Sequence, residues 1–149
     1  MASNRSKTLS GKTWFAAVII FAFLFSCDAF SDLKDCICSQ EFRVYTVTVV
    51  DQHKQPLDSL RINIYNPQSG REFDIEQNWS YGDPGMYVVM TDAYIRSLQE
   101  GGEPVIFEAE NDTLSASGQF YFTTDDCRCH VEKVSGPDTL VAAIKQKKI

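Results

Sequence analysis

Short runs of alternating apolar and polar residues, each closed by turn residues, constrain this chain to a β-sheet fold. Residues 42–50 (FRVYTVTVV) are rich in β-branched and aromatic side chains, and in 60–65 (LRINIY) every second residue is apolar. Residues 77–85 contain two glycines and a proline, which is typical of a loop. Further strands are expected at 71–75, 86–91, 104–110, 115–123, 127–134 and 139–144.

One short helix is expected among the strands. Asp92 is suited to cap one or two helical turns over 93–99, which the pair Gly101-Gly102 would end. About seven short strands at spacings of about ten residues, with little helix, predict an all-β sandwich of two packed sheets.

Within these strands, five segments resemble a known family. They are Val47–Asp51 (VTVVD), Gln55–Leu57 (QPL), Ile62–Asn66 (INIYN), Gly70 and Gly85–Val89 (GMYVV). In this order they look like the carboxypeptidase regulatory-like, transthyretin-like group of Ig-like β-sandwiches, over residues 42–144. The resemblance implies an Ig-like (transthyretin/prealbumin-like) sandwich that serves as an accessory, adhesive or binding module, and it implies fold more than function.

The N-terminal region is typical of an export signal. Arg5, Lys7 and Lys12 precede the apolar run 14–25 (WFAAVIIFAFLF). This run is shorter than the roughly 20 apolar residues that a membrane-spanning helix needs. We therefore expect residues 1–26 to be a helical signal peptide.

The end of that signal is similar to the lipobox of bacterial lipoproteins. Leu24-Phe25-Ser26-Cys27 has a branched apolar residue three positions before the cysteine and a small residue directly before it. Cys27 is then the expected lipidation site, and acyl chains contribute about 0.8 kcal/mol per buried methylene to membrane attachment. Ordinary cleavage a few residues later, or an uncleaved anchor, is the alternative. Residues 27–41 would form a tether before the 42–144 domain.

The charge distribution excludes one class of partner. The chain carries 20 acidic and 14 basic side chains. Three of the basic ones precede Cys27 and no acidic one does, so the remainder has 11 basic and 20 acidic side chains and a net charge of −9. Such a domain repels phosphate backbones, which argues against nucleic-acid binding. Residues 145–149 are a short basic tail.

Four further cysteines form two doublets, Cys36-Ile-Cys38 and Cys127-Arg-Cys129. An even number after an export signal favours disulfides. If each doublet lies on a strand, its two side chains share a face roughly 7 Å apart, so pairing between doublets is the better geometry. Antiparallel neighbours would pair Cys36 with Cys129 and Cys38 with Cys127. Parallel neighbours would pair Cys36 with Cys127 and Cys38 with Cys129.

The same doublets support an alternative. Two thiolate pairs beside His130 have the ligand types that zinc or copper prefers. The alternative function is therefore a periplasmic metal-binding protein that uses Cys36, Cys38, Cys127, Cys129 and His130.

The sequence gives little support for catalysis. It has two histidines, His53 in an expected turn and His130, around which a hydrolase triad would have to be built. It contains no Gly-x-Ser-x-Gly, His-Glu-x-x-His or phosphate-binding glycine motif. We therefore expect no enzyme activity and no cofactor.

Two further features have a structural and a functional interpretation. Asp125-Asp126, and Glu108 and Glu110 with Asp112, could offer oxygen ligands to calcium, but a solvated acidic surface is the favoured interpretation. Trp79-Ser80-Tyr81 could contact a protein or glycan partner, but half-buried loop packing is favoured.

Together these features predict a non-enzymatic, lipid-anchored protein of the bacterial cell envelope with a structural or partner-binding domain. It would attach to the outer membrane through its N-terminal lipid, on the periplasmic or the surface side. Without lipidation it would be secreted.

Overall fold

The computed structural model describes residues 36–77 and 82–145. The predicted signal peptide 1–26, Cys27, the loop Trp79-Ser80-Tyr81 and all but the first residue of the basic tail lie outside the described residues. The chain divides after Cys36 into two units, and the architecture that follows is that of the second.

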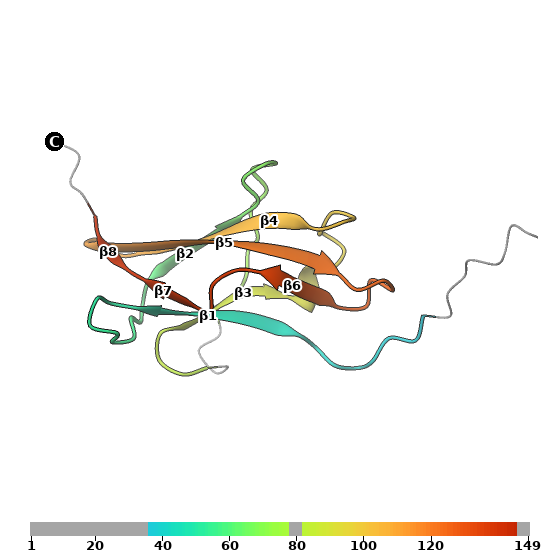
Figure 1. The fold of residues 1–149 in the computed structure, drawn as a ribbon, viewed down its shortest axis with the longest axis horizontal. Helices are drawn as coiled ribbons and strands as arrows, with labels where there is room; N and C mark the ends of the chain where they lie inside the picture. The colour runs from blue at the N-terminus through green and yellow to red at the C-terminus, as the bar shows by residue number, and fades with distance from the viewer. Residues whose placement is uncertain (1–35, 78–81, 146–149) are drawn as a thin grey trace, which may run out of the picture. The chain divides into compact units, whose positions relative to one another are not determined.

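The described residues form two β-sheets with one 3₁₀ turn, which confirms the all-β prediction (Figure 1). One sheet has the strand order β3-β1-β7, and the other has the order β2-β4-β5-β6, with β8 also paired to β5. The elements are β1 (Val44–Val50), β2 (Arg61–Tyr65), β3 (Met86–Thr91), η2 (Asp92–Tyr94), β4 (Glu103–Glu110), β5 (Leu114–Thr124), β6 (Val131–Ser135), β7 (Thr139–Val141) and β8 (Ala143–Ile144).

Large apolar side chains from both sheets meet between them. The rings of Phe107, Phe120 and Phe122, all at most 1% exposed, form a row, with Phe120 and Phe122 stacked at 6.1 Å between centroids. Val47 and Val49 of β1 are equally buried on the facing sheet. Alternation in the sequence thus produces a continuous core between two layers, which is the physical basis of a β-sandwich.

The last strand segment changes sheets. A single edge strand over 139–144 was expected, but β7 runs parallel to β1 and β8 pairs antiparallel with β5. Between them Ala142 is 2% exposed, and its N–H donates to the carbonyl of Val50 at 2.8 Å. A small residue fits there because the chain crosses the core edge at that point.

Gly85, directly before β3, and Tyr87, the second residue of β3, each have a structural role. Gly85 has φ +77°, and a Cβ there would lie 2.8 Å from the carbonyl oxygen of Val49. The buried hydroxyl of Tyr87 donates to the carbonyl of Leu57 at 2.8 Å and accepts from the N–H of Leu60 at 3.2 Å. This one side chain fixes the approach to β2 against the start of β3.

Two further predicted strands differ from the structure. Residues 71–75 form no strand, only the isolated bridge between Tyr65 and Glu72 and a hydrogen bond from the N–H of Phe73 to the carbonyl of Ile64. The strand predicted at 127–134 begins only at Val131, because the preceding residues form a turn in which Arg128 has φ 51°.

The predicted helix 93–99 is reduced to η2. Its cap is Thr91, whose hydroxyl accepts from the N–H of Ala93 at 3.3 Å, and not Asp92. The Asp92 carboxylate is not available as a cap because it accepts hydrogen bonds from two other segments, at Arg43 and Val131.

A buried ion pair joins β4 to the segment after β2. Glu103 is fully buried, and its carboxylate accepts from Asn66 and from the Arg71 guanidinium. Arg71 also donates to the carbonyl of Ser97 and lies 4.9 Å from the centre of the Phe73 ring. Its guanidinium therefore adds to the backbone hydrogen bonds and the buried Phe73 ring that hold residues 71–75 in place.

Candidate functional site

A disulfide joins the segment before β1 to the turn before β6. Cys38 is bonded to Cys129, 91 residues later, with their Cα atoms 5.3 Å apart. Cys36 and Cys127 are each in a disulfide as well. The Cys38–Cys129 pair belongs to the second of the two expected cross-pairings. Neither doublet lies on a strand, so pairing between the doublets was predicted correctly but the local structure assumed for it was wrong.

The disulfides bear on the metal alternative. A sulfur in a disulfide is not the thiolate that binds zinc or copper. Within residues 36–77 and 82–145, no group of three or more His, Cys, Asp or Glu side chains is placed to hold a metal ion. The metal-binding hypothesis therefore concerns a reduced form of the chain.

The disulfide brings the residues that follow Cys38 and Cys129 together. Ser39 Oγ lies 2.9 Å from Nε2 of His130, and Nδ1 of His130 lies 2.8 Å from Oδ2 of Asp92. Ser39 is exposed, whereas the side chains of His130 and Asp92 are 7% and 8% exposed. We call these three residues the Ser39 cluster.

Asp92 is held in its ionised form. Its Oδ2 accepts from the N–H of Arg43 at 2.9 Å, and its Oδ1 accepts from the N–H of Val131 at 2.7 Å. Burial alone would raise the pKa of Asp92, but the hydrogen bond from His130 and these two backbone hydrogen bonds together lower it. The carboxylate thus ties the start of β1 and the start of β6 to η2.

A shallow hollow of about 280 Å³ adjoins the Ser39 cluster. The Asp125 carboxylate at its edge accepts from the N–H of Cys129 at 2.6 Å. The hollow is lined by Ile37, Cys38, Ser39, Asp125, Asp126, Cys127, Cys129 and His130.

His130 was a candidate residue from the sequence alone, whereas Ser39 and the functional role of Asp92 were not predicted. No motif links three residues so far apart, yet one signal was present. Because Ser39 follows one cysteine doublet and His130 follows the other, the cross-pairing of Cys38 with Cys129 places their neighbours side by side. His53, the other histidine, is exposed in the turn after β1, as expected.

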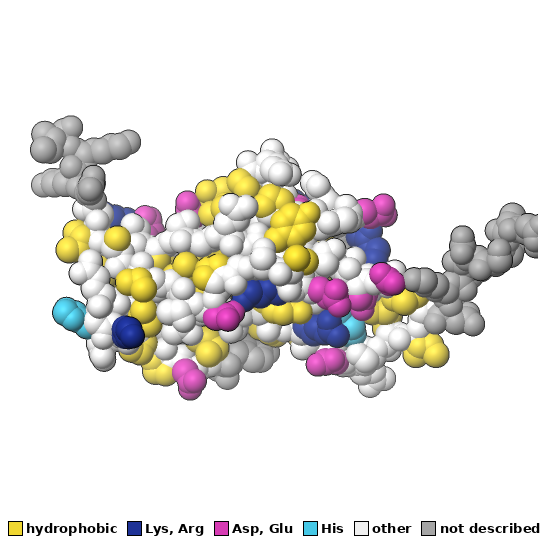
Figure 2. All heavy atoms as spheres, in the orientation of Figure 1, with side chains coloured by type: hydrophobic (Ala, Val, Ile, Leu, Met, Phe, Trp, Pro, Cys, Tyr) yellow, Lys and Arg dark blue, Asp and Glu magenta, His cyan; other side chains and the backbone are white. Residues whose placement is uncertain are grey.

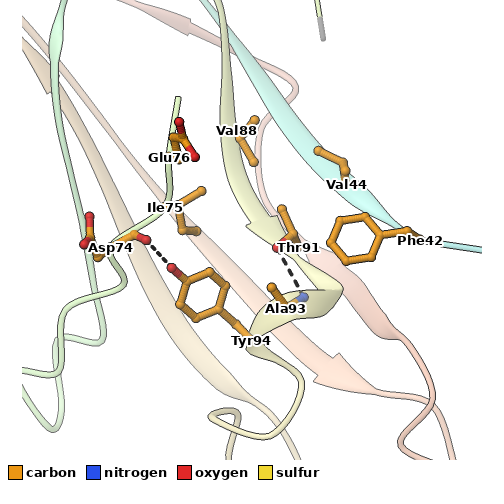
Figure 3. A pocket seen from close by; sticks show the side chains of 9 residues that line it. All are labelled: Phe42, Val44, Asp74, Ile75, Glu76, Val88, Thr91, Ala93 and Tyr94. Atoms are coloured by element: carbon orange, nitrogen blue, oxygen red, sulfur yellow. Dashed lines mark hydrogen bonds between the residues drawn. The ribbon is translucent and has the colours of Figure 1, made fainter. Parts of the chain in front are cut away.

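A second hollow lies beside β1 and β3 (Figure 3). Its volume is about 310 Å³, at the lower end of the range for ligand sites. Tyr94 points across it and donates a hydrogen bond to the carbonyl of Asp74. The lining residues are Phe42, Val44, Asp74, Ile75, Glu76, Val88, Thr91, Ala93 and Tyr94, and we call this site the β1–β3 hollow.

The β1–β3 hollow combines apolar and acidic groups. Phe42 is 61% exposed, and the exposed residues Asp74 and Glu76 bring two carboxylates. Burial, followed by the negative charge of Asp74, raises the pKa of Tyr94, so its hydroxyl keeps its proton. The site is suited to an apolar group that carries a positive charge.

Most of the other acidic candidates are occupied by partners within the chain. The Glu108 carboxylate accepts from Asn63 at 3.3 Å and from the Tyr65 hydroxyl at 3.2 Å. Glu110 pairs with Lys145 at 2.6 Å, and the hydrogen bond and charge of Lys145 lower the pKa of Glu110. Basic and acidic side chains are interspersed on the face shown in Figure 2. The favoured interpretation as a solvated surface fits these contacts.

The fold and its cystine define a small disulfide-bonded β-sandwich domain. No known protein family, no curated protein and no solved structure matches this chain. Among the described residues, no helix is long and apolar enough to cross a membrane.

Proposed function

We propose that this chain is a lipid-anchored protein of a bacterial cell envelope whose β-sandwich is displayed from the membrane and binds a partner. The observation that carries the proposal is the oxidised state of Cys38 and Cys129. Structural disulfides persist in exported proteins and are rare in the cytosol. They support the export that the basic and apolar N-terminal region predicts.

The position of the disulfide suits a domain held from its N-terminus. Cys38 lies between the proposed anchor at Cys27 and the first residue of β1, Val44, and it is bonded to Cys129 shortly before β6. Since β1 and β6 belong to different sheets, a pull on the tether is shared between both sheets.

The partner-binding part of the proposal rests on the β1–β3 hollow. Its exposed Phe42 and its two carboxylates fit a protein partner that presents an apolar side chain beside a lysine or arginine. Such a contact follows the usual anatomy of an interface, with an aromatic anchor inside a charged rim.

We also propose that the sandwich belongs to the carboxypeptidase regulatory-like group. The strand order of the N-terminal half supports this, with a proline turn after β1 and a glycine and a tyrosine at the start of β3. The group contains binding and accessory modules, which agrees with the proposed role.

Metabolic labelling with radioactive palmitate in a lipoprotein-processing bacterium tests the anchor. The native chain should take up label and sediment with membranes, whereas Cys27→Ser should lose both properties. Cys38→Ser is the matched control, because it removes a cysteine of the domain and should keep the label. Equal labelling of the native chain and Cys27→Ser would contradict the anchor.

A further inference from the structure

The Ser39 cluster forms a chain of hydrogen bonds from serine to histidine to aspartate, an arrangement that can activate the serine hydroxyl. Asp92 accepts from Nδ1 of His130, which fixes the ring in the tautomer that carries its proton on Nδ1. Nε2 then has a free lone pair, and the Ser39 hydroxyl at 2.9 Å donates to it. Both distances lie within the range expected for a nucleophile, its base and the group that orients the base.

The exposure of the three side chains also fits these roles. His130 and Asp92 are nearly covered, so the hydrogen bond between them is shielded from water. Ser39 is exposed and opens onto the hollow of about 280 Å³. The Cys38–Cys129 disulfide holds Ser39 and His130 together by their chain neighbours, so their contact does not depend on loop packing alone.

We propose that Ser39 is a nucleophile activated by His130, and that it forms a covalent ester with activated acyl or phosphonyl compounds. This goes beyond the proposed partner-binding function and runs against the expectation of no enzyme activity. With an ester, the Ser39 oxygen bonds to the carbonyl carbon, His130 takes the serine proton, and the C–O bond to the leaving alcohol breaks. His130 then protonates that alcohol, and water releases the acid from Ser39 by the reverse sequence.

The hollow also selects among substrates. Asp125 and Asp126 line it, and their negative charge repels an anionic acyl group. The chemical class that fits is therefore an ester whose acyl group is neutral or positively charged. The same carboxylates oppose the negative charge that develops on the carbonyl oxygen in both acylation and hydrolysis, so both steps should be slow and detection of the covalent adduct calls for a reagent with a good leaving group.

The first test is a neutral alkyl fluorophosphonate applied to the oxidised, folded protein, followed by mass spectrometry of its peptides. The Ser39 oxygen forms a bond to phosphorus, the P–F bond breaks, and fluoride leaves while His130 takes the proton. The expected result is one adduct, located on Ser39. No adduct, or adducts spread over several serines and tyrosines, would overturn the proposal without relying on any variant.

Variants then assign the roles. Ser39→Ala should abolish the adduct, whereas Ser117→Ala, which removes another exposed serine on β5, should leave it unchanged. His130→Gln should slow labelling by at least about 100-fold, the size typical of general-base catalysis. Because His130 is buried, each variant must first show the same unfolding transition as the native chain. In His130→Ala, added imidazole should restore labelling of Ser39.

Asp92 is assigned a positioning role. Asp92→Asn should slow labelling by about as much as His130→Gln, since an amide favours the wrong histidine tautomer. Asp92→Glu should restore part of the rate. Equal rates in the native chain, Asp92→Asn and His130→Gln would contradict the activation of Ser39.

Discussion

Removing Arg71 leaves a buried carboxylate without its cationic partner. Glu103 is fully buried, and its two oxygens accept from Arg71 and Asn66. In Arg71→Met the methionine keeps some packing against Phe73, but one carboxylate oxygen loses its donor. Breaking a buried ion pair in this way typically costs about 3–5 kcal/mol. Because the Arg71 side chain is 36% exposed, water can reach its position, and we expect a loss of about 2–4 kcal/mol.

Urea unfolding measures this loss directly. With a slope of about 2 kcal/mol per molar urea, the unfolding midpoint of Arg71→Met should fall by about 1–2 M at an unchanged slope. The melting temperature should fall by roughly 8–16 °C, at about 4 °C per kcal/mol for a domain of this size. Arg71→Lys keeps the charge and serves as the control, with a smaller loss.

A double variant separates the ion pair from packing. Glu103→Gln keeps an acceptor for Asn66 and removes the charge, at a cost of about 1.5–3 kcal/mol. When residue 103 is an uncharged glutamine, removing Arg71 no longer leaves a buried charge unpaired and should cost less stability. The double variant Arg71→Met/Glu103→Gln should therefore lose less free energy of unfolding than the two single variants lose in sum. The difference should be at least about 1 kcal/mol. Additive losses, or a loss below about 1 kcal/mol for Arg71→Met alone, would refute the reasoning.

Three further predictions concern the contacts that hold the sandwich together. Because folding lowers the pKa of Asp92 from 3.8, this group adds stability above about pH 4 that is lost as the pH falls through the lowered value. The stability advantage of the native chain over Asp92→Asn in denaturant unfolding should accordingly shrink below about pH 4, and a constant advantage would contradict this. Tyr87→Phe removes the partner of the Leu57 carbonyl and of the Leu60 N–H, and should cost about 1–3 kcal/mol in the same assay, whereas an unchanged midpoint would show that these bonds add nothing. Reduction of all cystines opens a loop of about 90 residues, so it should lower the free energy of unfolding by roughly 4–5 kcal/mol, and an unchanged midpoint would place the stability elsewhere.

The sequence predicted the parts of the fold that depend on alternation. β1, β2, β3, β4 and β5 lie close to their expected ranges, because each has an apolar face that must be buried. Residues 71–75 (REFDI) form no strand, and one of the contacts that hold them is the Arg71 guanidinium, whose pairing with the distant Glu103 no local pattern encodes. The predicted helix at 93–99 was wrong for a similar reason. The Asp92 carboxylate, expected to cap it, instead accepts hydrogen bonds from His130 and from two backbone amides of other segments.

The candidate sites show the same division between local and distant information. The cysteine doublets predicted disulfides and, among two alternatives, the pairing of Cys38 with Cys129. They did not predict that Ser39, His130 and Asp92 would meet, because Asp92 comes from η2, far from either doublet in the sequence. The β1–β3 hollow could not be predicted either, since its residues come from three separate segments.

The central claim is a lipid-anchored, oxidised domain, and the most direct test is the intact mass of the protein extracted from the envelope, with and without reduction. The account predicts the mass of residues 27–149 plus acyl groups, rising by about 4 Da on reduction as the four bonded cysteines each gain a hydrogen. A mass without lipid, or one that reduction leaves unchanged, would contradict it.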